Sequence, residues 1–397
     1  MKKASVVIGA NFGDEGKGLI TDYLSSPNSL VVRFNGGAQA GHTVVTPDGI
    51  RHVFSHFASG SLRGAHSFLS RFFIANPVLF VKEFSELTKK VSLGNVFIDP
   101  KCILTTPYDM MLNHIDAGNR SHGTCGVGIN ETVKRNERPE FSLKYQDTFF
   151  EDELRSILSS IRYKYMPQRL AELDQKIPEN LIHDELILER FINDIKFMQR
   201  KTQMSCWGAI SNIHEKQIFE GAQGLQLDED HHFFPHVTRS KTGLDNVITL
   251  ANEAGIEELQ VNYVSRIYAT RHGNGPLANE DDTFPEILSC KTNLENEYQG
   301  KFRYGLLEMT DMVSGIMKDL NRDTRINLQP RFALTHLDQC NDKISFCRAP
   351  EERVTMPMNE FIRQISRAID SQKNVDTALV SKGPTRNDVN MESLNGY

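Results

Sequence analysis

The chain has 397 residues, of which 39% are apolar and 24% are charged, and its formal net charge is −6. This length and composition predict a globular protein with enough apolar material for a large buried core. The acidic balance lacks the basic excess that polynucleotide binding requires, so we expect no nucleic-acid partner, whereas small anions need only local positive charge.

The cysteines and the N-terminus exclude further classes. The six cysteines are scattered without a Cys-x-x-Cys pair, which argues against a disulfide framework or a zinc site and fits a reducing cytoplasm. The apolar run that follows MKK is too short for a secretion signal or a membrane span, so we expect a cytoplasmic protein without membrane contact.

One sequence pattern recurs along the chain: a short β-branched run followed at once by a loop rich in Gly, Asn, Gln, Asp or Arg. It occurs six times, in SVVIGANFGDEGKG, LVVRFNGGAQAGHT, QIFEGAQGLQLD, VSRIYATRHGNGP, RFALTHLDQ and TALVSKGPTR. Segments with helical period, such as VLFVKEFSELTKKV, separate the units. The pattern predicts an α/β fold with a mostly parallel central sheet flanked by helices. Ligands bind beyond the carboxyl ends of such strands, so we expect these loops to meet at one edge.

The first unit ends in a loop that looks like a phosphate cradle but departs from the usual G-x-x-x-x-G-K-[ST] pattern. Asn11 stands where the first Gly belongs, and Gly18 stands where the hydroxyl belongs. Gly13 and Gly16 would let backbone amides approach an anion, and Lys17 would add charge to the outer phosphates. The alternative, a plain strand-to-helix turn, needs neither a lysine nor two acids.

The missing hydroxyl raises the question of what holds a metal ion. Inside the loop, the obvious ligand for Mg²⁺ is the carboxylate of Asp14. The second unit, NGGAQAGHT, places glycines around Gln39 and delivers His42. An imidazole there could donate to a transferring phosphoryl group, although a lone histidine is often structural.

Residues 150–202 are charged and helical in period. They predict a solvated helical insertion that serves as scaffold or lid, within a single domain that spans residues 1–397.

Six motifs follow one another along the chain: GxxFGDEGKG, NGGxxAGHT, FEGAQG, TRxGxGP, LTxLD and a final GP. In this order they resemble the adenylosuccinate synthetase family along nearly the whole chain. The resemblance implies a homodimer that uses Mg²⁺ and is built on a parallel sheet with some likeness to G proteins. It also implies a carbon–nitrogen ligase. In the first step, the γ-phosphate of a purine triphosphate moves to O6 of a 6-oxopurine monophosphate. In the second, the amine of L-aspartate displaces that phosphate from C6.

The resemblance also implies roles for particular residues. Asp14 matches the general base that removes the N1 proton and so makes O6 nucleophilic, and Lys17 and His42 complete the catalytic set. Asp14 and the carbonyl of Gly41 match the Mg²⁺ ligands. The implied triphosphate contacts are Gly13, Glu15, Gly16, Lys17, Gly18, Gly41, Thr43, His336, Asp338, Ser381, Gly383 and Pro384. The implied monophosphate contacts are Asn11, Gln39, Thr124, Cys125, Arg135, Gln223, Thr238, His272 and Gly273.

Arg135 is our match for an arginine that the family contributes across the dimer interface. The match requires a gap, which leaves Lys134 and Arg138 as rivals. In the aspartate loop, normally rich in arginine, the stretch QGKFRYG leaves only Lys301 and Arg303 to bind the aspartate carboxylates.

The chain departs from the family pattern mainly at the expected ligand positions. Gln39 replaces an Asn, and His272 stands where the family has a small apolar residue that faces the purine and ribose. The guanine-reading TKLD becomes THLD, so that His336 replaces the lysine whose stem covers the guanine. Asp338 survives, but a carboxylate can accept from a guanine N1–H or an adenine amino group.

These departures favour a virus-encoded branch of the family that ligates aspartate to dGMP with ATP, on the way to diaminopurine (2-aminoadenine) in phage DNA. The enzyme would then act in the host cytoplasm. The alternative is the housekeeping reaction of IMP with GTP, which the retained Asp14 favours because some members of the branch replace it. A different class, a nucleotide-binding switch, would explain the phosphate cradle but neither NGGAQAGHT nor the cationic loop.

Overall fold

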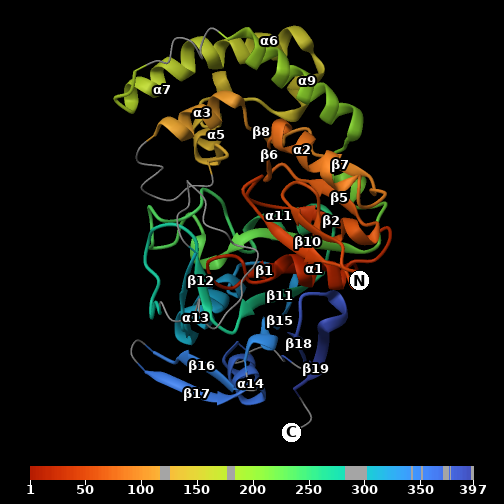
Figure 1. Ribbon diagram of the computed structural model, residues 1–397. Coiled ribbons are helices and arrows are strands. Elements are labelled where there is room, and N and C mark those ends of the chain that lie inside the picture. The colour runs from red at the N-terminus through yellow and green to blue at the C-terminus, as the bar shows by residue number, and fades with distance from the viewer. Residues whose placement is uncertain are drawn as a thin grey trace.

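In the computed structural model, the chain is built around a ten-stranded sheet that is parallel except at one edge (Figure 1). The structure describes residues 1–116, 126–176, 184–281, 302–340, 343–349, 352–369, 375 and 377–394. In spatial order the strands are β19 (Val389–Ser393), β18 (Thr377–Ser381), β15 (Asn327–Thr335), β11 (Glu258–Arg266), β1 (Lys3–Gly9), β10 (Gln217–Gly224), β2 (Leu30–Arg33), β5 (His66–Leu69), β7 (Val96–Ile98) and β9 (Gln203–Met204).

The six predicted strand-and-loop units supply six adjacent strands, in the order β18-β15-β11-β1-β10-β2. All five pairings among them are parallel, so their carboxyl ends lie at the same edge of the sheet. The predicted fold class and the expected meeting of the loops are thereby confirmed.

Helices bury both faces of the sheet, as a parallel sheet requires. On β1, Val6 and Ile8 belong to the core cluster on one face, while Val7 belongs to the cluster on the other. Residues from four helices complete the first cluster: α10 (Trp207–Ile210), α11 (Asp245–Glu253), α13 (Met309–Leu320) and α14 (Met358–Ile369). The second cluster is completed by α1 (Lys17–Leu24), which begins directly after the first loop.

A helical layer stands at one side of the sheet, with α6, α7 and α9 arching over α2, α3 and α5 (Figure 1). Its helices are α2 (Pro77–Leu87), α3 (Pro107–Ile115), α5 (Ile129–Asn136), α6 (Glu151–Ser160), α7 (Met166–Glu172) and α9 (Glu185–Lys201), with a π turn, η4 (Ile161–Tyr165), between α6 and α7. The described part of residues 150–202 is therefore largely helical, as its period predicted. That the chain is a single domain stays a prediction.

Local sequence explains where two of these helices begin. Asn76 and Thr106 accept hydrogen bonds from the backbone N–H groups of Leu79 and Asp109, and each precedes a proline at the first helical position. A polar cap followed by Pro is a strong helix start, because Pro has no N–H to leave unpaired.

Short strands extend from the main sheet. They form a three-stranded sheet of β14 (Leu307–Glu308), β16 (Lys343–Cys347) and β17 (Arg353–Pro357), and pairs of β3 (His42–Val45) with β4 (Arg51–Phe54), β6 (Ile74–Ala75) with β8 (Ile103–Leu104), and β12 (Ala269–Arg271) with β13 (Arg303–Gly305). Among the helices that the structure describes, none is long and apolar enough to cross a membrane.

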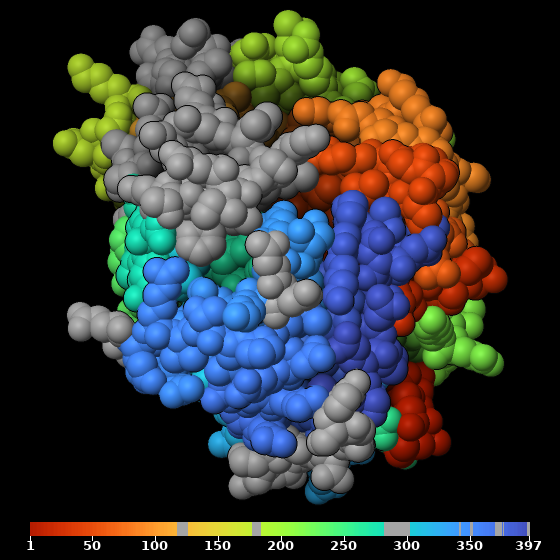
Figure 2. All heavy atoms as spheres, turned by 60° about the horizontal axis from the view of Figure 1, so that its bottom comes forward, coloured from red at the N-terminus to blue at the C-terminus, as the bar shows by residue number. Residues whose placement is uncertain are grey.

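The C-terminal residues return to the N-terminal part of the molecule. A β-bridge joins Val45 to Thr385, and Arg386 lies 3.0 Å from the Asp22 carboxylate on α1. In Figure 2, the dark blue C-terminal residues lie against red and orange residues of the N-terminal part. The segment that follows β18 is thereby held close to the first loop and its helix.

Candidate active site

The loop between β1 and α1 is held in a conformation that few residue types adopt. Gly13, Asp14 and Gly16 have φ angles of 93°, 62° and 96°. This left-handed region is free for glycine but unfavourable for Asp14. Its strain marks Asp14 as a position that the surrounding structure enforces. The Asp14 carbonyl accepts a 2.5 Å hydrogen bond from Arg266 Nε, which anchors it from β11.

Glu15 turns inward and organises the loop from within. Its carboxylate accepts from the backbone N–H groups of Asn11 (3.1 Å) and Gly13 (2.8 Å), and Lys17 Nζ lies 2.7 Å away. Glu15 and Lys17 are each only 2% exposed. The Glu15 carboxylate is thus used by the loop itself, and a triphosphate contact of Glu15 stays a prediction.

The position that normally carries a hydroxyl, Gly18, is tightly packed. A Cβ at Gly18 would lie 3.1 Å from both the His42 Cβ and the Thr43 carbonyl, and 3.2 Å from Ser59 Oγ. Strand β3 lies against the start of α1 there, so a serine or threonine at Gly18 would require its neighbours to move by a few tenths of an ångström.

His42 is buried beside the loop and held by β10. Its Nδ1 lies 2.6 Å from Glu220 Oε1, and its Nε2 lies 3.2 Å from the Ala222 carbonyl. Burial lowers the pKa of His42, and the neighbouring Glu220 carboxylate opposes that shift. Two residues upstream of Gly41, the amide atoms Nε2 and Oε1 of Gln39 have no hydrogen-bond partner among the described residues. The Gln39 amide is therefore buried with its hydrogen-bonding capacity unused among those residues.

The TRHGNGP unit brings a second imidazole to Asp14. His272 Nε2 lies 3.6 Å from Asp14 Oδ2, and the His272 ring packs on Phe302 with ring centroids 4.5 Å apart. Gln223 approaches the same loop, since its Oε1 lies 3.2 Å from the Cβ position at Gly13. The structure thus brings together Asp14, Gln223 and His272 from three strand ends, as predicted.

Two loops carry residues that are predicted to bind the triphosphate. His336 follows β15 with a φ of 64°, its Nδ1 lies 2.8 Å from Thr335 Oγ1, and its ring meets Tyr268 edge to face. Burial lowers the pKa of His336 well below its usual value, and the positive charge of the nearby Arg266 lowers it further. Asp338 is exposed just beyond it.

The loop after β18 supplies the other predicted contacts of the triphosphate base. Ser381 Oγ donates to the Gly383 carbonyl at 2.7 Å, and Pro384 is exposed beside it. Gly383 is required here because a Cβ would lie 2.6 Å from the Asp388 side chain.

The aspartate loop is only partly described. Lys301 lies outside the described residues, as do Thr124 and Cys125 of the predicted monophosphate site. Arg303 Nε and Nη2 donate to Glu280 at 2.8 and 2.5 Å, and its Nη1 donates to the Gly273 and Gly275 carbonyls at 3.2 and 2.8 Å. The Arg303 guanidinium is thus already engaged by a carboxylate.

Arg135 does not play the predicted role. It is fully buried, donates twice to the Asp109 carboxylate, and donates to the carbonyls of Leu104 and Phe141. A guanidinium committed to its own chain cannot reach a partner subunit, so the assignment of Arg135 is wrong. Its rivals remain at the surface, with side chains 30% exposed for Lys134 and 37% for Arg138.

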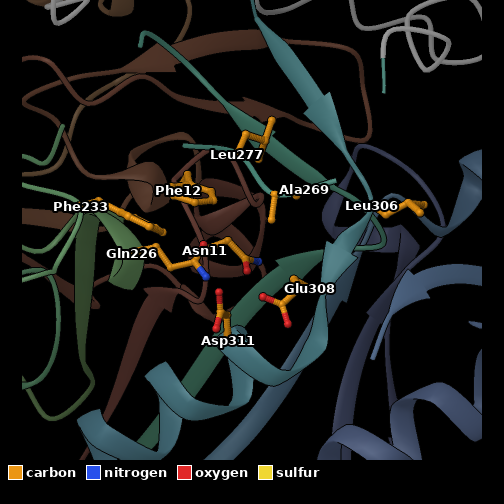
Figure 3. Close-up of a pocket in the computed structure, with 10 residues that line it drawn as sticks. Asn11, Phe12, Gln226, Phe233, Ala269, Leu277, Leu306, Glu308 and Asp311 are labelled. Carbon is orange, nitrogen blue, oxygen red and sulfur yellow. The ribbon is translucent and has the colours of Figure 1, made fainter. Parts of the chain in front are cut away.

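A small pocket opens behind the phosphate loop (Figure 3). Asn11, Gln226, Glu308 and Asp311 turn toward one another there, opposite apolar side chains that include Phe12 and Leu277. The Asn11 amide also donates to Ser265 Oγ at 2.9 Å. Burial and the adjacent Asp311 raise the pKa of Glu308 to about 7. A monophosphate contact through Asn11 stays a prediction, as does one through Thr238, whose backbone N–H donates to Leu227.

Sequence reasoning missed three charged residues of the site: Arg33, Glu220 and Glu280. Arg33 and Glu220 sit inside the β-branched runs before the loops, and a charge within an apolar strand is the signal that could have identified them. Glu280 carries no such signal, because its role depends on the pairing of its segment with β13.

Fold and site together define the class of protein. It is an α/β nucleotide-binding enzyme in which a backbone-lined loop, a buried lysine and a buried imidazole meet at the carboxyl edge of a parallel sheet. The profile of the family described as adenylosuccinate synthetase matches residues 6–356, and the chain therefore belongs to this family. It is a carbon–nitrogen ligase that acts on nucleotides and aspartate.

Individual relatives agree with this assignment. The chain is 28% identical to the adenylosuccinate synthetase of Wigglesworthia glossinidia brevipalpis, over 94% of this chain and 85% of the relative. It is 31% identical to that of Borrelia recurrentis (strain A1), over 87% of this chain and 79% of the relative.

Two solved structures share the fold. Fully ligated adenylosuccinate synthetase from Plasmodium falciparum matches with a TM-score of 0.75 and 19% identity, over 98% of this chain and 100% of that one. The succinoaminodeoxyadenylate synthetase of cyanophage S-2L, bound to dGMP and dATP, matches with a TM-score of 0.63 and 15% identity, over 98% of this chain and 95% of that one.

Proposed function

We propose that this enzyme joins L-aspartate to C6 of dGMP with ATP as the phosphoryl donor. The products are N6-succino-2-amino-2′-deoxyadenylate, ADP and phosphate. In the first step, Asp14 takes the N1 proton while the O6–P bond forms and the bond from Pγ to its bridging oxygen breaks. In the second step, the aspartate amine attacks C6, loses a proton, and phosphate leaves with O6.

The observation that carries the choice of purine is the 3.6 Å approach of His272 to Asp14. Guanine presents its N1–H and 2-amino donors side by side, whereas hypoxanthine has only the N1–H. A carboxylate with a second polar group beside it suits the guanine edge. A buried donor without an acceptor costs about 1 to 3 kcal/mol, so such a pair distinguishes the two bases.

The residues predicted to lie near the base of the triphosphate favour ATP as the phosphoryl donor. His336 holds the position at which the resemblance implies a lysine stem over guanine, and its ring is turned against Thr335 and Tyr268. The exposed carboxylate of Asp338 can accept from the amino group of adenine. The cyanophage synthetase of the same fold was solved with dGMP and dATP, a purine pair that matches this proposal.

The residues present fit Mg²⁺. Asp14 offers a carboxylate that is 26% exposed and Gly41 an exposed backbone position, and oxygen ligands of this kind are those that Mg²⁺ prefers. When bound, the ion offsets phosphate charge. Lys17 and the amides of the loop bind the same phosphates, and His42 donates to the phosphoryl group in transfer.

The second candidate is the ligation of IMP with GTP, and the bacterial relatives named adenylosuccinate synthetase favour it. We also infer a homodimer in which Lys134 or Arg138 reaches the partner's monophosphate. Light scattering with and without nucleotides tests that inference, and a monomer under both conditions would contradict it.

A turnover assay that crosses IMP, GMP and dGMP with ATP and GTP, at fixed aspartate and Mg²⁺, tests the substrate choice. We expect kcat/KM for dGMP with ATP to exceed that for IMP with GTP by roughly tenfold to a hundredfold. His272→Val should narrow the preference for dGMP over IMP. If the wild-type enzyme uses IMP with GTP at least as efficiently, the housekeeping reaction is the function.

A further inference from the structure

Glu220 is a carboxylate with 0% exposure in the middle of the central sheet. It lies on β10, in register with Val7 on β1 and with Arg33 on β2. An ionised carboxylate in such a place is costly unless charges and hydrogen bonds compensate it. The groups around Glu220 therefore show what the fold uses it for.

Three donors converge on the Glu220 carboxylate. Oε1 lies 2.6 Å from His42 Nδ1 and also accepts a short hydrogen bond from Ser59 Oγ, while Oε2 accepts from the Ser59 backbone N–H at 3.1 Å. Ser59 begins the 3₁₀ turn η1 (Ser59–Arg63), which packs against α1. Ser59 therefore holds both oxygens of the carboxylate, which cannot rotate away from His42 without losing its contacts to Ser59.

Arg33 supplies the balancing charge. It is fully buried, its guanidinium lies over the Phe73 ring at 5.3 Å, and its Nη1 donates to the Phe57 carbonyl at 3.4 Å. Its Nε and Nη2 have no hydrogen-bond partner within the described part of the chain. Burial alone would raise the pKa of Glu220, but the charges of Arg33 and His42 and the hydrogen bonds from His42 and Ser59 bring it down to about 2.

An ionised carboxylate only accepts hydrogen bonds, so the His42 Nδ1 must carry the proton that lies between them. The other ring nitrogen, Nε2, also faces an acceptor, the Ala222 carbonyl at 3.2 Å. The two contacts hold the ring between Glu220 and Ala222, and they fix which ring nitrogen faces each of them.

We infer that Glu220, clamped by Ser59 and balanced by Arg33, is the positioning residue that accepts the hydrogen bond from Nδ1 of His42 and so fixes the orientation of the ring. The inference rests on the proposed function, because it assumes that His42 donates to the phosphoryl group in transfer. Carboxylates that orient a working imidazole through its other nitrogen act in the same way in hydrolases and metal sites.

Glu220→Gln tests this inference, because it keeps the shape of the side chain and removes its charge. We expect kcat to fall by about tenfold to a hundredfold, as for other partners of a working histidine. The KM values for both nucleotides and for aspartate should stay within about threefold, since Glu220 is fully buried.

Glu83→Gln is the matched control. Glu83 is a second buried carboxylate with histidine partners, at 3.3 Å from His56 and 3.8 Å from His52, and it joins β4 to α2. Its kcat should stay within about threefold of wild type. An equal loss of kcat in both variants would mean that Glu220 is merely structural.

A measurement on the wild-type protein keeps the inference testable if Glu220→Gln does not fold. Long-range ¹⁵N–¹H NMR reports which ring nitrogens carry protons, and the His42 signals are those lost in His42→Asn. We expect Nδ1 to be protonated throughout the range from about pH 6 to pH 8.

A neutral His42 ring with its proton on Nε2 alone would overturn the inference. The proposed function is tested separately. If no purine pair supports ligation, that function fails, while the NMR result still decides the role of Glu220. If ligation proceeds and Glu220→Gln retains wild-type kcat, the inference fails while the proposed function stands.

Discussion

Asp14 combines backbone strain with a partly exposed carboxylate, which is unusual for a residue that only shapes a turn. Its φ is 62°, its carbonyl is held by Arg266, and its side chain is 26% exposed beside His272. Strained positions persist where the surrounding structure over-determines them, and they cluster at active sites. The loop thus presents one acid outward, Asp14, and keeps the other, Glu15, inside.

We therefore expect Asp14→Asn to abolish ligation while monophosphate binding stays within about tenfold, because the loss of a general base acts on the transition state more than on the ground state. Single-turnover kinetics and calorimetric titration with dGMP and IMP measure the two effects. Glu15→Gln, which changes the buried acid, should instead weaken triphosphate binding because the loop loses its brace. Near-normal turnover in Asp14→Asn would remove it from the mechanism.

At the scale of elements, residues that follow β12 already occupy the guanidinium of Arg303 on β13. The Arg303 guanidinium is bound in a bidentate manner by Glu280 and also bonds the turn at Gly273 and Gly275. A substrate carboxylate must compete with Glu280 for the same donors. The ion pair is therefore a built-in competitor for the aspartate that Arg303 is proposed to bind.

Glu280→Gln should lower the KM for aspartate by about threefold to tenfold, because a charge-assisted competitor is replaced by a weaker neutral one. The KM values for the nucleotides should not change. Glu253→Gln is the matched control, since it breaks the bidentate pair of Arg71 with Glu253, which includes none of the predicted site residues. An aspartate KM that rises in Glu280→Gln would show that the pair supports the site.

At the scale of the whole molecule, buried carboxylates make stability depend on pH. Burial alone would raise the pKa of Glu83, but hydrogen bonds from His52 and His56, with the charge of His56, lower it from 4.5 to about 2. Because the folded pKa lies below the unfolded one, this stabilisation is fully present above about pH 4.5 and is lost as the pH falls toward 2.

The difference corresponds to about 3 kcal/mol from this residue. Urea unfolding followed from pH 6 down to about pH 3 should therefore give a shallower loss of unfolding free energy in Glu83→Gln than in wild type. Parallel pH profiles for the two proteins would show that Glu83 has the same pKa in the folded and unfolded states.

Much of the fold and part of the site could be predicted from the sequence. The six strand-and-loop units and the helical residues 150–202 have local signatures, because β-branched runs, glycines and helical periods act over a few residues. Parallel strands place their carboxyl ends at one edge, so the meeting of Asp14 and Gln223 followed from strand type. His272 lies beyond β12, outside the parallel sheet, and its approach to Asp14 is decided by the fold.

The sequence by itself determined six of the ten strands of the sheet and the edge at which their loops meet. Only the tertiary structure decided where the charged side chains turn: Glu15 into the loop, Arg135 into its own helical layer, and Arg303 onto Glu280. The reason is physical. A long charged side chain reaches several ångströms from its backbone, and its choice of partner depends on the charges that other segments bring within that reach. Glu220 reaches His42 and Ser59 only because β10, β3 and η1 meet in the folded chain.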